Sequence, residues 1–268
     1  MKKIPLFYWS SVKFENKPKE NYGDLLSKYI VEKISAEKVK WVHPKKQPWY
    51  RFDKTNYLGI GSILAHASKN SIVWGSGIID QNHPVEKADF RAVRGPKTRE
   101  RLLALGYKCP EIYGDPALLL PKYFNPKVEK KYKVGIVPHY VDFEGVTRQF
   151  RNQEEIIVID MLTKDIESTT REILSCEKII SSSLHGLIVA HAYGIPAIWA
   201  KFSDKIFGDG IKYQDYFLSV GKENISVNEI GGGIFPKISK DEINYFLPDD
   251  QKVAEIKRML FESCPFKS

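Results

Sequence analysis

Short apolar runs that alternate with segments of helical periodicity are the feature of this sequence that most constrains its fold. Several runs have the apolar and β-branched character of buried strands: Ile4–Trp9, Val39–Val42, Ser71–Trp74, Phe90–Val93, Lys133–Val137, Ile156–Ile159, Lys178–Ser181 and Ala197–Ala200. Apolar residues recur at helical spacing in the segments between them: Asp24–Ser35, Lys97–Leu105, Asp165–Ser175 and Leu184–Tyr193. This alternation predicts an α/β fold in which most strands are parallel.

The alternation stops between residues 120 and 131, where two prolines and several charged residues lie close together. Such a composition is typical of a linker between domains. We therefore expect two α/β domains, at about 1–122 and 131–250. A final helical segment, Lys252–Phe261 within 251–268, is expected to pack back on the first domain.

The composition favours a protein of the reducing cytoplasm. The three cysteines are scattered and odd in number, so neither a disulfide framework nor a metal site is expected. No apolar run reaches the length of a membrane span, and the start of the chain predicts a first strand and not a signal peptide. The net charge of +8 would attract phosphates, an anionic lipid surface or nucleic acid, but a generally cationic solvated surface is the favoured explanation.

Two glycine-containing segments follow predicted strands. In Asn21-Tyr22-Gly23-Asp24 the glycine would let backbone N–H groups approach a ligand, and the helix N-terminus favours an anion. A plain helix cap by Asn21 or Asp24 is the alternative. In Trp74-Gly75-Ser76-Gly77 a buried strand ends where α/β sheets bind ligands, and a tight turn is the alternative.

Arg94 ends another predicted strand and directly precedes a helix. Its planar guanidinium can bind a carboxylate or phosphate with two hydrogen bonds, and the adjoining helix N-terminus adds free N–H donors. Downstream, Asp115 lies in a turn after a short strand, where an aspartate usually caps its own turn.

The segment Ser181-Ser182-Ser183-Leu184-His185-Gly186 links a strand to a helix. His185 lies in the first helical turn beside three hydroxyls, which indicates an anion pocket that contains a titratable group. His191 falls on the apolar stripe of the helix and is expected in the core. His139 follows the first strand of the second domain, so the carboxyl-end rule also places it in the cleft, unless it is an ordinary loop histidine.

Taken together, several segments resemble the polysaccharide pyruvyl transferase family. They are Asn21-Tyr22-Gly23-Asp24, Ile60-Gly61-Ser62-Ile63-Leu64, Trp74-Gly75-Ser76-Gly77, Val93-Arg94-Gly95-Pro96, Gly114-Asp115-Pro116-Ala117-Leu118-Leu119, Val137-Pro138-His139-Tyr140, Ser183-Leu184-His185-Gly186, and the late stretch Phe207-Gly208-Asp209-Gly210 with Lys212 and Asp215-Tyr216-Phe217. The resemblance is strongest to members that add pyruvate ketals to exopolysaccharides. It runs from about residue 20 to 220.

The resemblance implies two Rossmann-like domains that face each other across a cleft, as in GT-B glycosyltransferases. It implies phosphoenolpyruvate as the donor substrate, with no cofactor, and a glycan or lipid-linked glycan as the acceptor. It also implies an anion-binding role for Arg94 and a catalytic role for His185. One departure matters: many relatives have arginine where this chain has Ser183, and Lys212 is our candidate for the substitute cation.

On this basis His185 is the expected general acid, and Asp24 is either the base for the sugar hydroxyl or a helix cap. The expected substrate-binding residues are Asn21, Gly23, Gly75, Ser76, Gly77, Asp115, His139, Ser182, Ser183 and Lys212. The donor's phosphate and carboxylate would favour the charged imidazolium of His185.

Three other functions compete with this interpretation. A nucleotide-sugar glycosyltransferase of GT-B architecture would also place a phosphate at a helix N-terminus, but no pair of residues suited to reading a base or ribose is evident. A non-catalytic anion-binding module would bind the donor without releasing phosphate. Nucleic acid is not an expected partner, because aromatic residues do not alternate with the basic ones as stacking requires.

Contact with the inner membrane surface would suit the positive charge.

Overall fold

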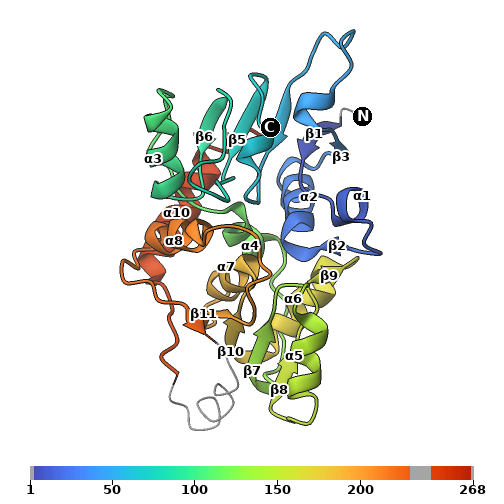
Figure 1. Cartoon of the computed structure of the whole chain (residues 1–268), viewed down its shortest axis with the longest axis vertical. Coiled ribbons are helices and arrows are strands. Elements are labelled where there is room, and N and C mark those ends of the chain that lie inside the picture. The colour runs from blue at the N-terminus through green and yellow to red at the C-terminus, as the bar shows by residue number, and fades with distance from the viewer. Residues whose placement is uncertain (1–2, 230–242, 267–268) are drawn as a thin grey trace.

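The computed structural model describes residues 3–229 and 243–266, and its first half is built around a parallel sheet (Figure 1). The five strands of this sheet are ordered β3-β1-β4-β5-β6. Their bounds are β1 (Ile4–Phe7), β3 (Val39–Trp41), β4 (Asn56–Leu58), β5 (Ser71–Trp74) and β6 (Asp89–Ala92). In the register, Leu6 of β1 pairs with Trp41 on one side and Tyr57 on the other.

The second half of the chain forms another five-stranded parallel sheet, ordered β12-β11-β10-β7-β8. Its strands are β7 (Tyr132–Val137), β8 (Ile156–Val158), β10 (Cys176–Ser181), β11 (Ala197–Lys201) and β12 (Asn228–Glu229). The predicted α/β fold with parallel sheets is therefore confirmed. Part of the expected second domain, residues 230–242, lies outside the described residues.

A short antiparallel pair joins the two halves. Strand β2 (Glu20–Asn21) pairs with β9 (Leu162–Thr163), and the backbone N–H of Tyr22 donates to the carbonyl of Met161 at 2.7 Å. These bonds hold the start of the helix that follows β2 against the second half of the chain.

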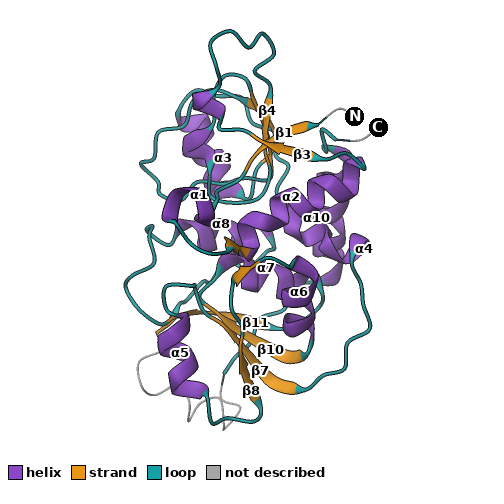
Figure 2. Cartoon of the chain, turned by 90° about the vertical axis from the view of Figure 1, so that its right-hand side faces the viewer, coloured by secondary structure: helices purple, strands orange, loops and turns teal. Residues whose placement is uncertain are grey.

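Helices surround both sheets (Figure 2). The α-helices are α1 (Ser11–Glu15), α2 (Tyr22–Ser35), α3 (Pro96–Ala104), α4 (Leu120–Tyr123), α5 (Phe143–Phe150), α6 (Ile166–Leu174), α7 (Leu184–Ala192), α8 (Ile211–Ser219) and α10 (Asp250–Glu262). Short 3₁₀ turns are η1 (Pro44–Lys46), η2 (Leu64–His66) and η3 (Pro116–Leu119). Among the described residues, no helix is both long enough and apolar enough to cross a membrane.

Several elements were not predicted, each for a local reason. Strand β4 has only three residues and begins with Asn56, whose side chain is buried and accepts a hydrogen bond from Ser71 Oγ at 2.7 Å. Helix α5 contains Gly145, which lowers its helical propensity. Helix α8 follows Gly210 at φ +84°, in a stretch whose glycines suggest a loop. The segment expected to be a linker also differs from the prediction at its start. Leu120, its first residue, begins helix α4 and is fully buried.

The core is continuous across the two halves. Every residue of α7 is buried, as expected for a helix that is apolar on all sides, and the helix contacts both α2 and η3. The C-terminal helix α10 reaches the first half, where the Trp74 indole donates to the carbonyl of Leu260 at 2.9 Å. Gly114, at φ +135°, leaves the space that Ile256 and Leu260 fill. This packing brings the N-termini of α2 and α7 together near the centre of the molecule (Figure 1).

Candidate active site

His185 lies at the N-terminus of α7 and packs directly on Gly23 of α2. A Cβ atom added at Gly23 would lie 2.0 Å from His185 Nδ1, far inside van der Waals contact. Only glycine therefore fits beneath this imidazole. Only about 9% of His185 is exposed, so the ring is held in one place by its surroundings.

A buried carboxylate faces the other nitrogen of the same imidazole. Asp115 Oδ2 lies 3.4 Å from His185 Nε2, and no surface of Asp115 is exposed. Its second oxygen, Oδ1, accepts from the backbone N–H of Ala117 at 2.9 Å. Asp115 thus caps its own turn, as the sequence suggested, and also faces the histidine. Neither Asp115 Oδ2 nor His185 Nε2 has a hydrogen-bond partner among the described residues.

Asp24 follows Gly23 in the first turn of α2 and lies near the same histidine. Burial raises the pKa of the Asp24 carboxyl to about 7, and the charges of His185 and Lys212 act in the opposite direction. A carboxyl group with a pKa near neutrality can exchange a proton at physiological pH. The helix is capped by Asn21, whose Oδ1 accepts from the Gly23 N–H at 2.9 Å. The cap therefore uses the Asn21 side chain and the Gly23 N–H, two groups that we had expected to contact a ligand. Asp24 is not the cap, so its carboxyl group is available for proton transfer.

Lys212 supplies positive charge from α8. Burial, together with the charge of Arg94, lowers the pKa of Lys212 to about 8, and the charge of Asp24 opposes the shift. His139 lies in the same electrostatic group: burial, together with the charge of Lys212, lowers the pKa of His139 to about 4. Both halves of the chain therefore contribute ionisable groups to one cluster.

Arg94 is held by protein groups and is fully buried. Its Nε donates to Asp215 Oδ2 at 3.0 Å, one terminal nitrogen to Ser62 Oγ at 2.6 Å, and the other to the carbonyl of Ile78 at 2.6 Å. Neither side chain of the Arg94–Asp215 pair has exposed surface. This differs from our expectation that the guanidinium is open to a ligand. The physical reason is that a buried charge requires a partner, and Asp215 of α8 provides it.

The Gly75-Ser76-Gly77 segment also faces the protein. Gly75, at φ +96°, packs on Pro116 and donates to the carbonyl of Ala92 at 2.9 Å, while Ser76 Oγ donates to the carbonyl of Gly59 at 2.6 Å. A Cβ at Gly77 would lie 2.3 Å from Arg94 Cζ. The structure shows the tight turn that was the alternative here, and a substrate contact of this segment stays a prediction. Gly77 leaves space for the guanidinium.

The serines before α7 mostly bond to the loop itself. Ser181 Oγ donates to the carbonyls of Val137 and Ser183, and Ser182 Oγ accepts from the His139 N–H at 2.8 Å. The Ser183 side chain makes no capping hydrogen bond. Ser182 Oγ therefore helps to fix the position of His139, and its hydroxyl proton can still be donated to an anionic ligand.

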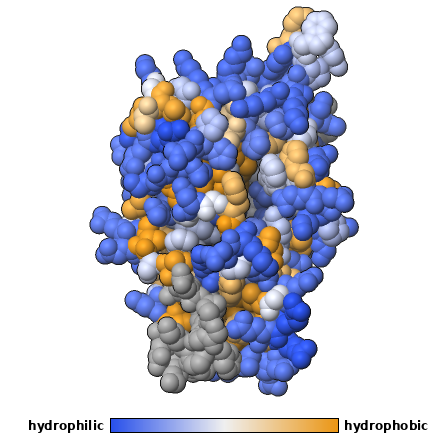
Figure 3. Space-filling view, in the orientation of Figure 1, coloured by the Kyte–Doolittle hydropathy of each residue, from blue (hydrophilic) through white to orange (hydrophobic). Residues whose placement is uncertain are grey.

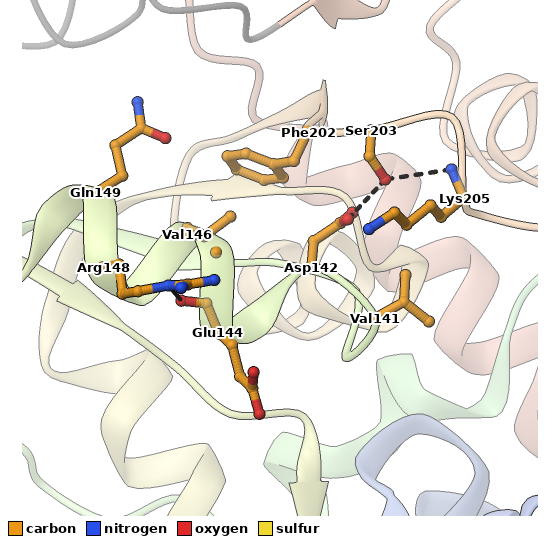
Figure 4. Close-up of a pocket in the computed structure, with 10 residues that line it drawn as sticks. Val141, Asp142, Glu144, Val146, Arg148, Gln149, Phe202, Ser203 and Lys205 are labelled. Atoms are coloured by element: carbon orange, nitrogen blue, oxygen red, sulfur yellow. Dashed lines mark hydrogen bonds between the residues drawn. The ribbon is translucent and has the colours of Figure 1, made fainter.

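A separate polar pocket of about 350 Å³ opens beside the segment that follows His139 (Figure 4). Its lining includes Asp142, Phe202 and Lys205, and Asp142 Oδ1 accepts from Ser203 Oγ at 2.6 Å. None of the site residues predicted from the sequence lines it. Within the described ranges, no group of three or more histidine, cysteine or acidic residues could hold a metal ion.

Sequence reasoning did not assign roles to Ser62 and Asp215, the two side chains that hold the Arg94 guanidinium. Both lie within segments that carried the family resemblance. The signal that could have found them was therefore present, but nothing in the sequence pairs either residue with Arg94.

The chain is similar to known proteins over most of its length. The family model of polysaccharide pyruvyl transferase matches residues 21–201. An uncharacterised protein of Acanthamoeba polyphaga mimivirus is 32% identical over 245 residues, which is 82% of each chain. Succinoglycan biosynthesis protein ExoV of Rhizobium meliloti is 26% identical over 231 residues, or 80% of this chain and 64% of that protein.

Among solved structures, a functionally uncharacterised protein of Klebsiella pneumoniae aligns with a TM-score of 0.46 and 16% identity, covering 85% of this chain and 93% of that one. The family match covers more than half of the chain and includes both Gly23 and His185. This chain is a member of the polysaccharide pyruvyl transferase family.

Proposed function

We propose that the protein transfers a pyruvyl group from phosphoenolpyruvate to two hydroxyls of one sugar, which closes a cyclic ketal and releases phosphate. The sugar belongs to a surface polysaccharide or to its lipid-linked precursor at the cytoplasmic face of the inner membrane. The observation that carries the proposal is the contact between Gly23 and the His185 ring. It unites two family segments from opposite halves of the chain around one titratable group.

The reaction needs a proton donor, anion binding and exclusion of water. Protonation of the methylene carbon of phosphoenolpyruvate gives an oxocarbenium-like centre next to the carboxylate. One sugar hydroxyl attacks that carbon, the carbon–oxygen bond to phosphate breaks, and the second hydroxyl then closes the ring. The sugar hydroxyls lose two protons in all. One of them restores the proton that the enzyme gave to the methylene carbon, and the other leaves with the phosphate. No redox change is involved.

His185 is the proposed general acid, with Asp115 as its positioning residue. A carboxylate on one imidazole nitrogen orients the ring and stabilises the charged form. The bound phosphate and carboxylate of the donor add to this effect, because two full charges at a few ångströms outweigh the partial charge of a helix N-terminus. We expect His185 to become protonated when the donor binds.

Lys212 is the proposed contact for the donor's anionic groups. It is only partly exposed, and its neighbours include Arg94, which carries a second positive charge. Asp215 already compensates the charge of Arg94, so a bound anion would mainly compensate the charge of Lys212, and its arrival should be favourable. Arg94 itself then acts mainly through Asp215, by fixing α8 and hence the position of Lys212.

Asp24 is the proposed base for the attacking hydroxyl, and its titration gives a prediction. Because burial raises the pKa of Asp24 to about 7, the carboxyl is mostly protonated below that pH and ionised above it. The base form therefore accumulates as pH rises, and kcat/KM should increase through about pH 7. The pH profile of phosphate release measures this. Asp24→Asn should remove that rise, whereas the exposed Asp89→Asn should keep it. An unchanged profile in Asp24→Asn would exclude the base role.

Gly23→Ala should lower turnover by about 100-fold, the scale expected when a catalytic group is displaced by about 1 Å. The new methyl would overlap His185 Nδ1 and push the ring from its place. Gly145→Ala is the matched control, because a Cβ there meets nothing within 4 Å. Steady-state kinetics, with circular dichroism to confirm folding, make the comparison. Equal turnover in the two variants would show that the position of the ring is not critical.

Phosphate release, assayed against a panel of free and lipid-linked glycans, tests the function itself. Saturation-transfer NMR that compares phosphoenolpyruvate with a nucleotide sugar separates pyruvyl transfer from glycosyl transfer. Preferential binding of the nucleotide sugar, or donor binding without phosphate release in the presence of any acceptor, would count against the proposal.

A further inference from the structure

The loop between η1 and β4 carries exposed aromatic side chains at one end of the molecule. Trp49 is 88% exposed, Tyr50 67% and Phe52 106%. The segment projects beyond the first sheet in both ribbon views, and its tip shows pale and orange at the upper right of Figure 3. We call residues 47–54 the aromatic loop. The other large hydrophobic residues exposed in the described chain are less exposed than Trp49 and Phe52: Val12 and Phe14 of α1, Leu103, Val141, Phe207 and Leu247.

The aromatic loop is closed at its base by hydrogen bonds. Gln47 Nε2 donates to the carbonyl of Lys54 at 2.8 Å, and the Arg51 N–H donates to the carbonyl of Pro48 at 3.2 Å to form a turn. At the tip, the Trp49 and Tyr50 rings meet edge to face with centroids 6.0 Å apart. The turn therefore presents its aromatic rings to solvent, although water contact is unfavourable for such side chains.

Basic residues flank these rings. Lys46, Arg51 and Lys54 lie in or beside the loop, and the only acidic residue between them is Asp53. The neighbouring Lys45 is bound instead to Glu86 at 2.8 Å and to the carbonyl of Ala65 at 3.0 Å. The tip thus combines apolar rings with an excess of positive charge.

We propose that the aromatic loop docks the protein on an anionic lipid bilayer. Trp, Tyr and Phe are favourable at the boundary between headgroups and acyl chains, and lysine and arginine are attracted to anionic headgroups. The two kinds of residue favour the same surface, which explains why they occur together on a projecting turn. Docking itself does not depend on the reaction; only its purpose, bringing the site to a lipid-linked acceptor, rests on the proposed function.

Vesicle co-sedimentation of the full chain tests this surface. Wild-type protein should bind vesicles of phosphatidylcholine mixed with phosphatidylglycerol and should bind pure phosphatidylcholine weakly, with binding that falls as salt is raised. The triple variant Trp49→Ser, Tyr50→Ser, Phe52→Ser should lose about ten-fold or more in partition coefficient. Lys46→Glu with Arg51→Glu should lose at least as much.

Matched controls separate the loop from general effects. Leu103→Ser removes an exposed apolar side chain elsewhere, and Lys127→Glu with Lys131→Glu makes the same charge change at exposed positions after α4. Both should bind as wild type does. Phosphate release with a soluble glycan should also be unchanged in the triple variant, so failure of docking and failure of the proposed function are distinguishable.

Three outcomes would overturn the proposal. The first is wild-type protein that fails to bind anionic vesicles. The second is a triple variant that binds them as well as wild type. The third is a change confined to self-association by light scattering or to binding of free glycan, which would assign the loop to a second copy of the chain or to the acceptor.

Discussion

Replacing His185 with alanine should lower turnover at least ~100-fold, the scale typical of a lost general acid. The imidazole lies at the meeting point of α2, η3 and α7. It rests on Gly23, and the Asp115 carboxylate faces it at 3.4 Å. Loss of the acid should act on kcat, because proton transfer to the methylene occurs in the transition state, whereas binding of the donor should change much less. Phosphate-release kinetics measure both parameters.

Asp115→Asn is the informative companion to this variant. It keeps the shape and the cap to Ala117 but removes the charge that faces His185. We expect a smaller loss than in His185→Ala, and we expect the pH profile to shift because the charged imidazole is less stabilised. Near-normal turnover in His185→Ala, with the fold intact by circular dichroism, would exclude His185 as the acid.

Asp215→Ala should produce the largest loss of stability, about 3–5 kcal/mol, because it leaves the Arg94 guanidinium charged and unpaired in the interior. Asp215 also accepts hydrogen bonds from the N–H of Thr98 at 2.9 Å and its hydroxyl at 2.6 Å. Those donors would lose their partner as well. The free energy of unfolding in urea measures the effect.

An exposed ion pair of α3, the helix that contains Thr98, provides the control. Lys97 and Glu100 lie 2.8 Å apart with solvent access, so Glu100→Ala should cost less than about 1 kcal/mol. Replacing Arg94 and Asp215 together by apolar residues should recover part of the loss, since no unpaired charge remains. Equal stability of Asp215→Ala and Glu100→Ala would show that the buried pair does not hold α8 in place.

Arg94→Ala is expected to lose at least ~100-fold in turnover, whether the arginine touches the donor or acts through Asp215 and α8. Comparing Arg94→Ala with Asp215→Ala distinguishes direct contact with the donor from positioning of α8. If the arginine positions α8, Asp215→Ala should lower turnover similarly at a temperature where both variants are folded. A full loss in Arg94→Ala with normal turnover in Asp215→Ala would indicate direct contact with the donor.

The sequence predicted the parts of this site that depend on local pattern. Both His139 and His185 follow strands of one parallel sheet, so the carboxyl-end rule was enough to place them near each other. It could not predict the Asp115–His185 contact or the Arg94–Asp215 pair. These join residues far apart in the chain, and no periodicity or motif encodes such a pairing.

The glycines show why the same signal can have two meanings. A glycine next to a ligand and a glycine next to a neighbouring side chain look alike in a sequence, because both positions exclude a Cβ. Gly77 leaves room for Arg94, and Gly23 leaves room for His185. Only the three-dimensional packing distinguishes a glycine that shapes the candidate site from one that supports it at a distance.

The most direct test of the account is mass spectrometry of the acceptor after incubation with phosphoenolpyruvate and the purified protein. A sugar-containing acceptor should gain the mass of pyruvate less one water, with one phosphate released for each ketal formed, and His185→Ala should abolish both signals together. Phosphate release without any change in the acceptor, or transfer that persists in His185→Ala, would contradict it.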